Sequence, residues 1–289
     1  ILGSSRGHQR PEVMVDVLQK HRINMLFCLG GDGTMRGTEK IFEEISTRGE
    51  QIAVIGVPKT IDNDLPYIER TFGFDTAVSI ASNAIQAAHV EATGAPRGIG
   101  LVRLMGRHAG FIAAAAPLAW REVNLVLVPE LPFDLDGERG VIAYLRRRLL
   151  DRDHAVVVVA EGAGQRHLEH DAVRDASGNL KLGDIGVFLR DRFKAELKEI
   201  GVNLKYIDPS YIIRAAPANP VDSIFCGQLA EDAVHAAMAG KTGLVVGLWL
   251  NRFTHVPLTA VTAGQKKIDL DGSFWRNVVE STGQPLLLA

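Results

Sequence analysis

The chain has 289 residues, of which 46% are hydrophobic and 23% are charged, and this balance excludes an intrinsically disordered protein. The formal net charge of −2 gives no general attraction to nucleic acid or to an anionic membrane, so we expect neither as a partner. The longest apolar stretch, Phe111 to Ala119, is too short to cross a bilayer. Cys28 and Cys226 are the only cysteines, which argues against a disulfide framework and favours a reducing, cytoplasmic compartment.

Short apolar runs, glycine-containing turns and amphipathic stretches alternate along the chain, as is typical of parallel sheets covered by helices. In chain order we predict a strand at Ile23–Leu29, a helix at Thr34–Ser46, a strand at Ile52–Val57, a helix at Asp75–Glu91, a strand at Ile99–Leu104, a helix at Gly110–Ala119, a strand at Leu125–Val128, a helix at Glu138–Leu150, a strand at Ala155–Ala160, helices at Ile185–Glu199 and Ala230–Ala239, and strands at Leu244–Leu248 and His255–Pro257. The alternation predicts an α/β protein with mainly parallel sheets. Ligands of such folds bind beyond the carboxyl ends of the strands, so the turns after the strands are the candidate sites.

The first candidate turn, Gly30-Gly31-Asp32-Gly33-Thr34, follows a predicted strand and opens a predicted helix. Glycines at this place let backbone N–H groups approach a polyphosphate, and the helix N-terminus then faces the anion. A carboxylate such as Asp32 suits a phosphate site when a metal ion lies between them, which favours Mg²⁺. The alternative is a plain strand-to-helix turn in which Asp32 is a cap.

The second candidate turn is Pro58-Lys59-Thr60-Ile61-Asp62-Asn63-Asp64, where two carboxylates stand two residues apart beside a lysine. A hydroxyl that attacks a phosphoryl group must give up its proton, and a positioned carboxylate accepts it. Lys59 is suited to neutralising charge on the transferring group. Taken alone, the segment is better explained by a hydrated Asx-turn loop.

Further strand-end residues carry charges that phosphates and sugars recognise. Arg107 follows a strand in Met105-Gly106-Arg107 and suits bidentate phosphate recognition, whereas Glu161 follows Ala155–Ala160 and suits sugar hydroxyls. Tyr211 and Arg214 are three residues apart and share one face if that segment is helical. Each of these residues is by itself equally compatible with an ordinary salt bridge, cap or surface position.

Together and in this order, the motifs resemble the 6-phosphofructokinase family. The resemblance covers essentially the whole chain. Its longer motifs are most similar to the branch that contains the plant and trypanosomatid ATP-dependent enzymes. It rests on Gly30-Gly31-Asp32-Gly33-Thr34, Pro58 to Asp64, Thr71-Phe72-Gly73-Phe74-Asp75-Thr76-Ala77, Met105-Gly106-Arg107, Pro129-Glu130, Ala160-Glu161-Gly162 and Tyr211-Ile212-Ile213-Arg214.

The resemblance implies a glycolytic phosphoryl transfer to the 1-hydroxyl of fructose 6-phosphate, which gives fructose 1,6-bisphosphate with Mg²⁺. It implies that Asp62 is the catalytic base, with Lys59, Asp64 and Arg107 as further catalytic residues. Asp32 matches the metal-associated carboxylate, with Asp64 as a second candidate beside it. The implied nucleotide site is Gly31, Asp32, Gly33, Thr34, Gly37 and Arg6, which bridges donor and sugar sites. The implied fructose 6-phosphate site is Thr60, Asp62, Met105, Gly106, Arg107, Glu161, Lys205, Tyr211 and Arg214.

The phosphoryl donor is indicated by two positions at which members of the family differ. Lys59 is the residue found in pyrophosphate-dependent members, whereas Gly33 stands where those members commonly carry a second aspartate. Gly33 leaves room for the α-phosphate and nucleoside of ATP, so we expect ATP and keep pyrophosphate as the alternative. Lys205 and Gly98 stand where bacterial members have arginines for the sugar phosphate, and Arg103 is a candidate substitute for the missing grip.

The family pattern also implies two domains and an oligomer. We expect residues 1–75 and 212–262 to form a nucleotide-binding domain and residues 76–211 and 263–289 to form a fructose 6-phosphate-binding domain. A homodimer or homotetramer with allosteric regulation is the implied assembly. The chain starts at Ile1 without the strand and glycine-rich turn that open family members, so we expect an incomplete first domain.

Two other functions remain open at this point. The Gly-Gly-Asp-Gly-Thr turn is shared with lipid kinases and NAD kinases, but those enzymes do not need the Thr60–Asp64 loop. A catalytically inactive regulator that binds nucleotide or sugar phosphate is the second, and the presence of both Asp32 and Asp62 argues against it.

Overall fold

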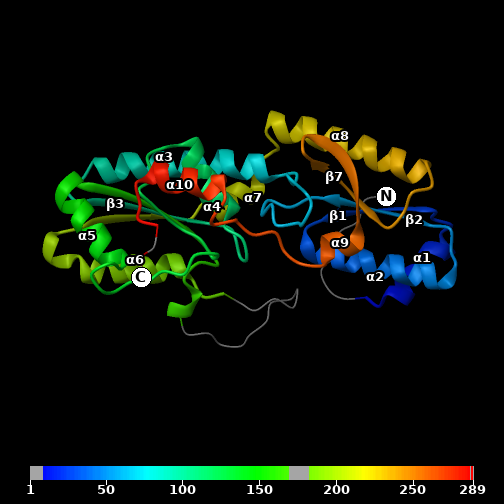
Figure 1. Ribbon diagram of the computed structural model, residues 1–289, viewed down its shortest axis with the longest axis horizontal. Helices are drawn as coiled ribbons and strands as arrows, with labels where there is room; N and C mark the ends of the chain where they lie inside the picture. The colour runs from blue at the N-terminus through cyan, green and yellow to red at the C-terminus, as the bar shows by residue number, and fades with distance from the viewer. Residues whose placement is uncertain (1–8, 169–181, 287, 289) are drawn as a thin grey trace. The chain divides into compact units, whose positions relative to one another are not determined.

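The computed structural model describes residues 9–168, 182–286 and 288. They form two compact units, of which the first contains residues 9–74 and 218–266 and the second residues 75–168, 182–217, 267–286 and 288. Each unit is built on its own four-stranded sheet, and Figure 1 labels the elements of both. Arg6, from the predicted nucleotide site, lies outside the described residues.

The sheet of the first unit has the strand order β1-β2-β7-β8. Its first three strands run parallel, and β8 returns antiparallel to β7 as the edge strand. Gly30 at the end of one strand is paired with Pro58 at the end of the next, so the two turns that the sequence singles out leave neighbouring strands. The strands are β1 (Met25–Gly30), β2 (Ala53–Pro58), β7 (Leu244–Trp249) and β8 (Arg252–Pro257).

Helices cover both faces of this sheet, because successive strand residues point to opposite sides. Val54 packs in a cluster with Met35 and Leu258, whereas Ile55 packs in another cluster with Phe225. Figure 1 shows α8 on one side of the sheet and α2 and α9 on the other. The helices of the first unit are α1 (Pro11–Lys20), α2 (Asp32–Arg48), α8 (Pro220–Met238) and α9 (Leu258–Thr262).

The sheet of the second unit has the order β4-β5-β3-β6, and all its strands are parallel. Leu104 at the end of β3 is paired with Ala160 at the end of β5, so the residues that follow these two strands leave the same edge. The interior of β5 is an unbroken run of buried valines, as expected for a strand covered on both faces. The strands are β3 (Gly98–Leu104), β4 (Leu125–Leu127), β5 (His154–Ala160) and β6 (Asn203–Ile207).

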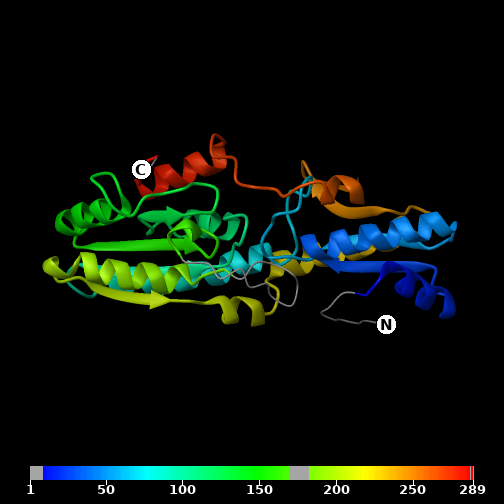
Figure 2. The ribbon, with the colours of Figure 1, turned by 90° about the horizontal axis from the view of Figure 1, so that it is seen from below.

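Figure 2 shows the three layers of the second unit, with α3 and α6 on one face of the sheet and α5 and α10 on the other. α4 packs against α10 and β4, and α7 follows β6 directly. The helices are α3 (Phe74–Thr93), α4 (Phe111–Ala119), α5 (Val141–Arg152), α6 (Ile185–Glu196), α7 (Ser210–Ala215) and α10 (Ser273–Thr282), with short 3₁₀ turns at Gln165–His167 and Lys198–Ile200.

The predicted α/β class with mainly parallel sheets is confirmed, and every predicted strand is present. Five helices and strands of the described residues were not predicted: α1, β6, α7, α9 and α10. The helix predicted at Ala230–Ala239 begins earlier, at Pro220, because the Asn219 side chain caps it by accepting the N–H of Asp222 at 2.8 Å. The helix predicted at Ile185–Glu199 ends at Glu196, and a 3₁₀ turn follows.

The state of the two cysteines and the character of the helices bear on the compartment and membrane expectations. Both cysteines are free thiols, and burial raises the pKa of Cys28. Within the described part of the chain, no helix combines the length and the apolar character needed to span a membrane.

Candidate functional site

The first strand-end turn passes directly from β1 into α2, and its first two glycines stand in close contact with other residues. A Cβ atom on Gly30 would come within 2.1 Å of the Thr34 hydroxyl oxygen, so only glycine fits there. A Cβ atom on Gly31 would lie 3.1 Å from the Cβ of Thr60, which shows that this turn packs against the second turn. A Cβ atom on Gly33 or Gly37 would meet no atom of the described residues within 4 Å. The first turn of α2 therefore has an open side that is accessible to a ligand.

Asp32 is the first residue of α2, where a negative charge is stabilised by the helix dipole. Its side chain is 23% exposed and forms an ion pair with Arg36 one helical turn later. The Arg36 Nε atom donates to Asp32 Oδ1 at 3.0 Å and to Oδ2 at 3.2 Å. The carboxylate is thus reachable from solvent, and an exposed pair of this kind is weak enough for a stronger cation to replace it.

The second strand-end turn is fixed by hydrogen bonds around Asp62. The Thr60 hydroxyl accepts the backbone N–H of Asp62 at 3.2 Å, and the Thr71 hydroxyl donates to the carbonyl of Thr60 at 2.7 Å. Asn63 has φ of 53°, a left-handed conformation that asparagine tolerates, and its side-chain oxygen accepts the N–H of Thr71 at 3.1 Å. Asp62 therefore sits in a turn whose backbone is held on both sides.

Lys266 adds a cation to the same turn from a distant part of the chain. Its Nζ atom donates to the Asn63 side-chain oxygen at 3.1 Å and to the carbonyls of Ile68 and Glu69 at 2.7 and 3.2 Å. Its backbone N–H donates to the carbonyl of Asp64 at 2.8 Å. Burial lowers the pKa of Lys266 to about 8, although the carboxylates of Asp64 and Glu69 oppose that shift.

The segment after the second turn is anchored on α8. The buried Asp222 side chain accepts the N–H of Gly73 at 3.0 Å, and the Arg70 guanidinium lies 4.6 Å from the centre of the Phe225 ring. Lys59 is exposed and bridges to Phe72 through the backbone, because Phe72 donates its N–H to the Pro58 carbonyl. Phe72 and Gly73 of the Thr71–Ala77 motif thus connect the second turn to α8.

The second unit gathers its predicted residues where β3 and β5 end. Glu161 donates its N–H to the carbonyl of Leu104 at 2.8 Å, and Gly162 donates to the carbonyl of Gly106 at 3.0 Å. A Cβ atom on Gly162 would come within 1.9 Å of the Arg107 carbonyl oxygen, so the two loops touch backbone to backbone. Met105, Gly106, Arg107 and Glu161 therefore form one cluster.

Arg103, at the end of β3, stands at the centre of an acidic group beside that cluster. It donates to Glu161 at 2.9 Å and to Asp208 at 2.7 Å, and Asp184 lies 3.8 Å away. Burial by itself lowers the pKa of Arg103, but Asp208 and Glu161 outweigh it and the pKa is raised. Burial, together with Asp184 and Asp208, raises the pKa of the neighbouring Tyr206 to about 12. The hydrogen bonds of the guanidinium to side-chain carboxylates are thus those to Glu161 and Asp208, and its role toward a sugar phosphate stays a prediction.

Lys205, Tyr211 and Arg214 belong to β6 and to the helix α7 that follows it. The strand register sets Lys205 opposite Gly100, in the middle of β3 and well before its carboxyl end. Tyr211 and Arg214 fall three residues apart on the short helix α7, and both are exposed, Tyr211 to 88%. The helix brings these two side chains to one face.

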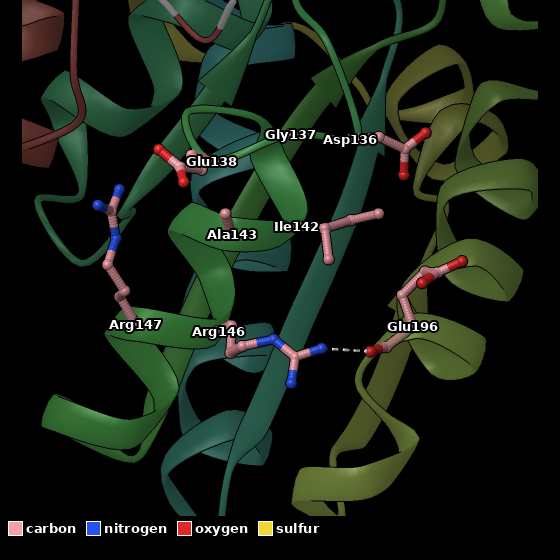
Figure 3. Close-up of a pocket in the computed structure, with 8 residues that line it drawn as sticks. All are labelled: Asp136, Gly137, Glu138, Ile142, Ala143, Arg146, Arg147 and Glu196. Atoms are coloured by element: carbon pink, nitrogen blue, oxygen red, sulfur yellow. Dashed lines mark hydrogen bonds between the residues drawn. The ribbon is translucent and has the colours of Figure 1, made fainter.

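A surface hollow of about 550 Å³ lies elsewhere in the second unit and contains none of the predicted site residues. In Figure 3 the Arg146 guanidinium points across it toward Glu196, whose backbone carbonyl accepts its hydrogen bond at 2.9 Å. Both acidic and basic side chains line it, so no ligand class is indicated. It is lined by Asp136, Gly137, Glu138, Ile142, Ala143, Arg146, Arg147 and Glu196.

Three participants in these networks were not found by sequence reasoning. Arg36 had a usable signal, since it stands four residues after Asp32 on a predicted helix. Asp208 had a weaker one, because it follows Asn203–Ile207, a short segment of mixed polarity that forms β6. Lys266 had none, because it is 203 positions from Asn63 and only the fold brings them together.

Comparison with known proteins provides an independent line of evidence. A family model described as phosphofructokinase matches residues 1–237. The chain is 50% identical to the ATP-dependent 6-phosphofructokinase of Borreliella burgdorferi, with 99% of this chain and 66% of that protein covered. It is 48% identical to ATP-dependent 6-phosphofructokinase 1 of Arabidopsis thaliana, with 99% and 62% covered, and 49% identical to the ATP-dependent 6-phosphofructokinase of Trypanosoma brucei brucei, with 98% and 59% covered.

Solved structures share the fold. A pyrophosphate-dependent phosphofructokinase from Marinobacter aquaeolei superimposes with a TM-score of 0.77 at 25% identity, covering 99% of this chain and 73% of that one. A phosphofructokinase from Saccharomyces cerevisiae does so with a TM-score of 0.69 at 19% identity, covering 98% and 39%. The chain thus spans 59% to 66% of the length of the three curated relatives named above.

Proposed function

Because the chain belongs to the phosphofructokinase family, we propose that the protein transfers the γ-phosphoryl group of ATP to the 1-hydroxyl of fructose 6-phosphate, which gives fructose 1,6-bisphosphate in glycolysis. The observation that carries this proposal is the contact between the two strand-end turns of the first unit. The glycine turn at Gly31 packs on Thr60, and the Thr60 hydroxyl fixes the backbone of Asp62. A phosphate cradle and a candidate base are thereby built side by side.

Within this proposal the first unit binds the donor. Gly31, Gly33, Thr34 and Gly37 line the start of α2, where backbone N–H groups and the helix dipole favour phosphate oxygens. The open space at Gly33 is consistent with a nucleoside triphosphate. Arg6 is proposed as a further donor ligand from the family pattern alone.

Asp62 is proposed as the general base. It accepts the proton of the sugar hydroxyl as that oxygen attacks phosphorus, and the hydrogen bonds around it hold its backbone in place for the transfer. Lys59 is exposed beside it and supplies positive charge to the transferring group. Asp64, two residues later, is buried and orients the loop through its carbonyl, which accepts from Lys266.

Mg²⁺ is proposed as the metal, with Asp32 as its protein ligand. One partly exposed carboxylate at a helix N-terminus fits a Mg²⁺ ion that takes its remaining ligands from phosphates and water. Among residues 9–168, 182–286 and 288 no group of three or more His, Cys, Asp or Glu side chains has metal-binding geometry. Bound there, the ion would neutralise charge on the phosphates.

The second unit is proposed to bind fructose 6-phosphate. Arg107 suits the phosphate and Glu161 suits the sugar hydroxyls, and their loops touch where β3 and β5 end. Tyr211 and Arg214 offer a second pair of polar groups on α7. Met105, Gly106, Thr60, Asp62 and Lys205 complete the proposed sugar-phosphate residues.

Pyrophosphate is the alternative donor, favoured by Lys59 and by the name of the Marinobacter aquaeolei structure. The names of the three curated relatives cited above favour ATP. We further propose that the protein forms a homodimer or a homotetramer. We also propose a cytoplasmic location, which the two free thiols support.

The test is a coupled assay on the full-length protein with fructose 6-phosphate and Mg²⁺, run in parallel with ATP and with pyrophosphate. We expect turnover with ATP and little with pyrophosphate. The reverse pattern would assign the alternative donor. Binding of both ligands without turnover with either donor would instead support an inactive regulator.

A further inference from the structure

We propose that Lys266 is a positioning residue for the proposed reaction: through Asn63 it holds the turn that carries the base Asp62. This inference rests on the proposed function, because it assigns Lys266 a task in that same turn. It goes beyond the family pattern, since no motif of the sequence includes this lysine.

The contacts of Lys266 reach the carboxyl end of the turn and the segment after it. The ammonium donates to oxygens of the Asn63 side chain and of the carbonyls of Ile68 and Glu69. The backbone N–H of the same residue holds the carbonyl of Asp64 at 2.8 Å. Lys266 therefore grips the chain on the carboxyl side of Asp62 at four points.

Asn63 transmits this grip to the base. Its side-chain oxygen accepts from both Lys266 Nζ at 3.1 Å and the Thr71 N–H at 3.1 Å, and its backbone is in the left-handed region. Asparagine tolerates the left-handed region but does not require it, so the side-chain hydrogen bonds help to hold Asn63 in that conformation. Loss of the ammonium would release the carboxyl side of the turn while Thr60 still holds the amino side.

Burial explains why a lysine in this place is significant. Burial of an ammonium costs free energy, which is seen here as the lowering of the pKa of Lys266 to about 8. An apolar side chain would avoid the cost of burial, but it would leave these acceptors unpaired and the carboxylates of Asp64 and Glu69 without the cation. The three directed hydrogen bonds are what the apolar replacement cannot provide.

The experiment compares Lys266→Met, Lys266→Ala and Lys266→Arg with the matched control Lys267→Met in the full-length protein. Lys267 is the adjacent lysine and is exposed, so its replacement removes the same charge without touching the turn. Values of kcat and of KM for fructose 6-phosphate and for the donor are measured. Calorimetric titration with fructose 6-phosphate gives the fraction of each protein that is competent to bind.

We expect Lys266→Met to lower kcat about 30-fold per binding-competent molecule, with both KM values changed less than about threefold, because a displaced base impairs the transfer more than binding. Lys266→Arg is expected to keep more of kcat than Lys266→Met. Added ethylammonium is expected to restore kcat of Lys266→Ala about fivefold or more by occupying the vacated space. Lys267→Met is expected to match the wild type.

A Lys266→Met variant with wild-type kcat, or one whose KM rises as much as its kcat falls, overturns the inference. The inference is also overturned if ethylammonium does not raise the kcat of Lys266→Ala and the kcat of Lys266→Arg is no higher than that of Lys266→Met. If Lys266→Met does not fold, the amine rescue and the arginine variant decide the question. A wild type that turns over neither ATP nor pyrophosphate refutes the proposed function, and the inference falls with it; an active wild type with an active Lys266→Met refutes the inference alone.

Discussion

The guanidinium of Arg103 and the carboxylate of Glu161 are joined by a hydrogen bond of 2.9 Å at the carboxyl edge of the second sheet. Arg103 stands at the end of β3 and Glu161 just after β5, two neighbouring parallel strands. The same guanidinium holds Asp208 at 2.7 Å. Arg103, which the family resemblance suggests as a ligand of the sugar phosphate, is therefore hydrogen-bonded to Glu161, the residue proposed to bind the sugar hydroxyls.

Replacement of this arginine gives the first prediction. Arg103→Met leaves two partly buried carboxylates without their cation, and we expect a loss of about 3 kcal/mol in the free energy of unfolding. The KM for fructose 6-phosphate should rise at least about tenfold, because Glu161 loses its orientation. Denaturant unfolding and steady-state kinetics measure the two effects. Arg190→Met is the control, since Arg190 pairs with the exposed Asp191; equal effects of both variants would contradict this role.

The second prediction concerns Asp62. Asp62→Ser removes the proposed base while Thr60 can still fix the backbone of the turn through its hydroxyl. We expect kcat to fall by about 10²- to 10⁴-fold, with affinity for fructose 6-phosphate largely kept. Kinetics and calorimetric titration check the two quantities. Unchanged turnover would show that Asp62 is not the base.

The third prediction tests the donor at Gly33. A Cβ at this position meets no atom of the described residues within 4 Å, so both Gly33→Asp and Gly33→Ala should fold, and each should match or exceed the wild-type melting temperature because glycine is a poor helix former. The aspartate introduces a charge that repels the α-phosphate. We expect kcat/KM for ATP to fall about 100-fold in Gly33→Asp, whereas Gly33→Ala stays within about fivefold. If both variants lost ATP turnover equally, bulk rather than charge would be responsible.

The fourth prediction concerns the ion pair between Asp32 and Arg36. Because Arg36 competes with a metal ion for this carboxylate, Arg36→Gln should lower the Mg²⁺ concentration needed for half-maximal activity about twofold. The loss in the free energy of unfolding should stay below about 0.5 kcal/mol, as for exposed helix pairs. A magnesium titration of activity measures the effect. A higher magnesium requirement would mean that Arg36 itself binds the phosphates.

The fifth prediction is a dependence of stability on pH through Tyr206. Its pKa is raised from 10.0 to about 12 by burial and by the nearby Asp184 and Asp208. The unfolded chain therefore ionises this tyrosine before the folded chain does, so its contribution is complete below pH 10.0 and is lost as pH rises toward about 12. Urea unfolding across this range should show a steeper loss for the wild type than for Tyr206→Phe. Identical slopes would contradict the shifted pKa.

The strands and the turns that follow them were predictable because their signals are local. A buried parallel strand needs a run of Val, Ile and Leu, and a turn against a helix start needs glycine, as at Gly30. The family resemblance rests on the same short motifs, and it is confirmed by the matching family model. By contrast, β6 was missed because its five residues are of mixed polarity and tertiary packing stabilises the strand. The helix α10 was missed although its ten residues are amphipathic.

The sequence by itself determined the α/β class, the family and the residue types that phosphoryl transfer needs, because each of these is indicated by motifs of a few consecutive residues. Only the tertiary structure decided which partners those residues have. Arg103 could be read as a phosphate ligand until the strand register set it between Glu161 and Asp208, and Lys266 became relevant only when the chain returned it to Asn63. The physical reason is that hydrogen bonds and ion pairs depend on distances of about 3 Å, and proximity between residues far apart in the chain is set by the packing of the sheet and its helices.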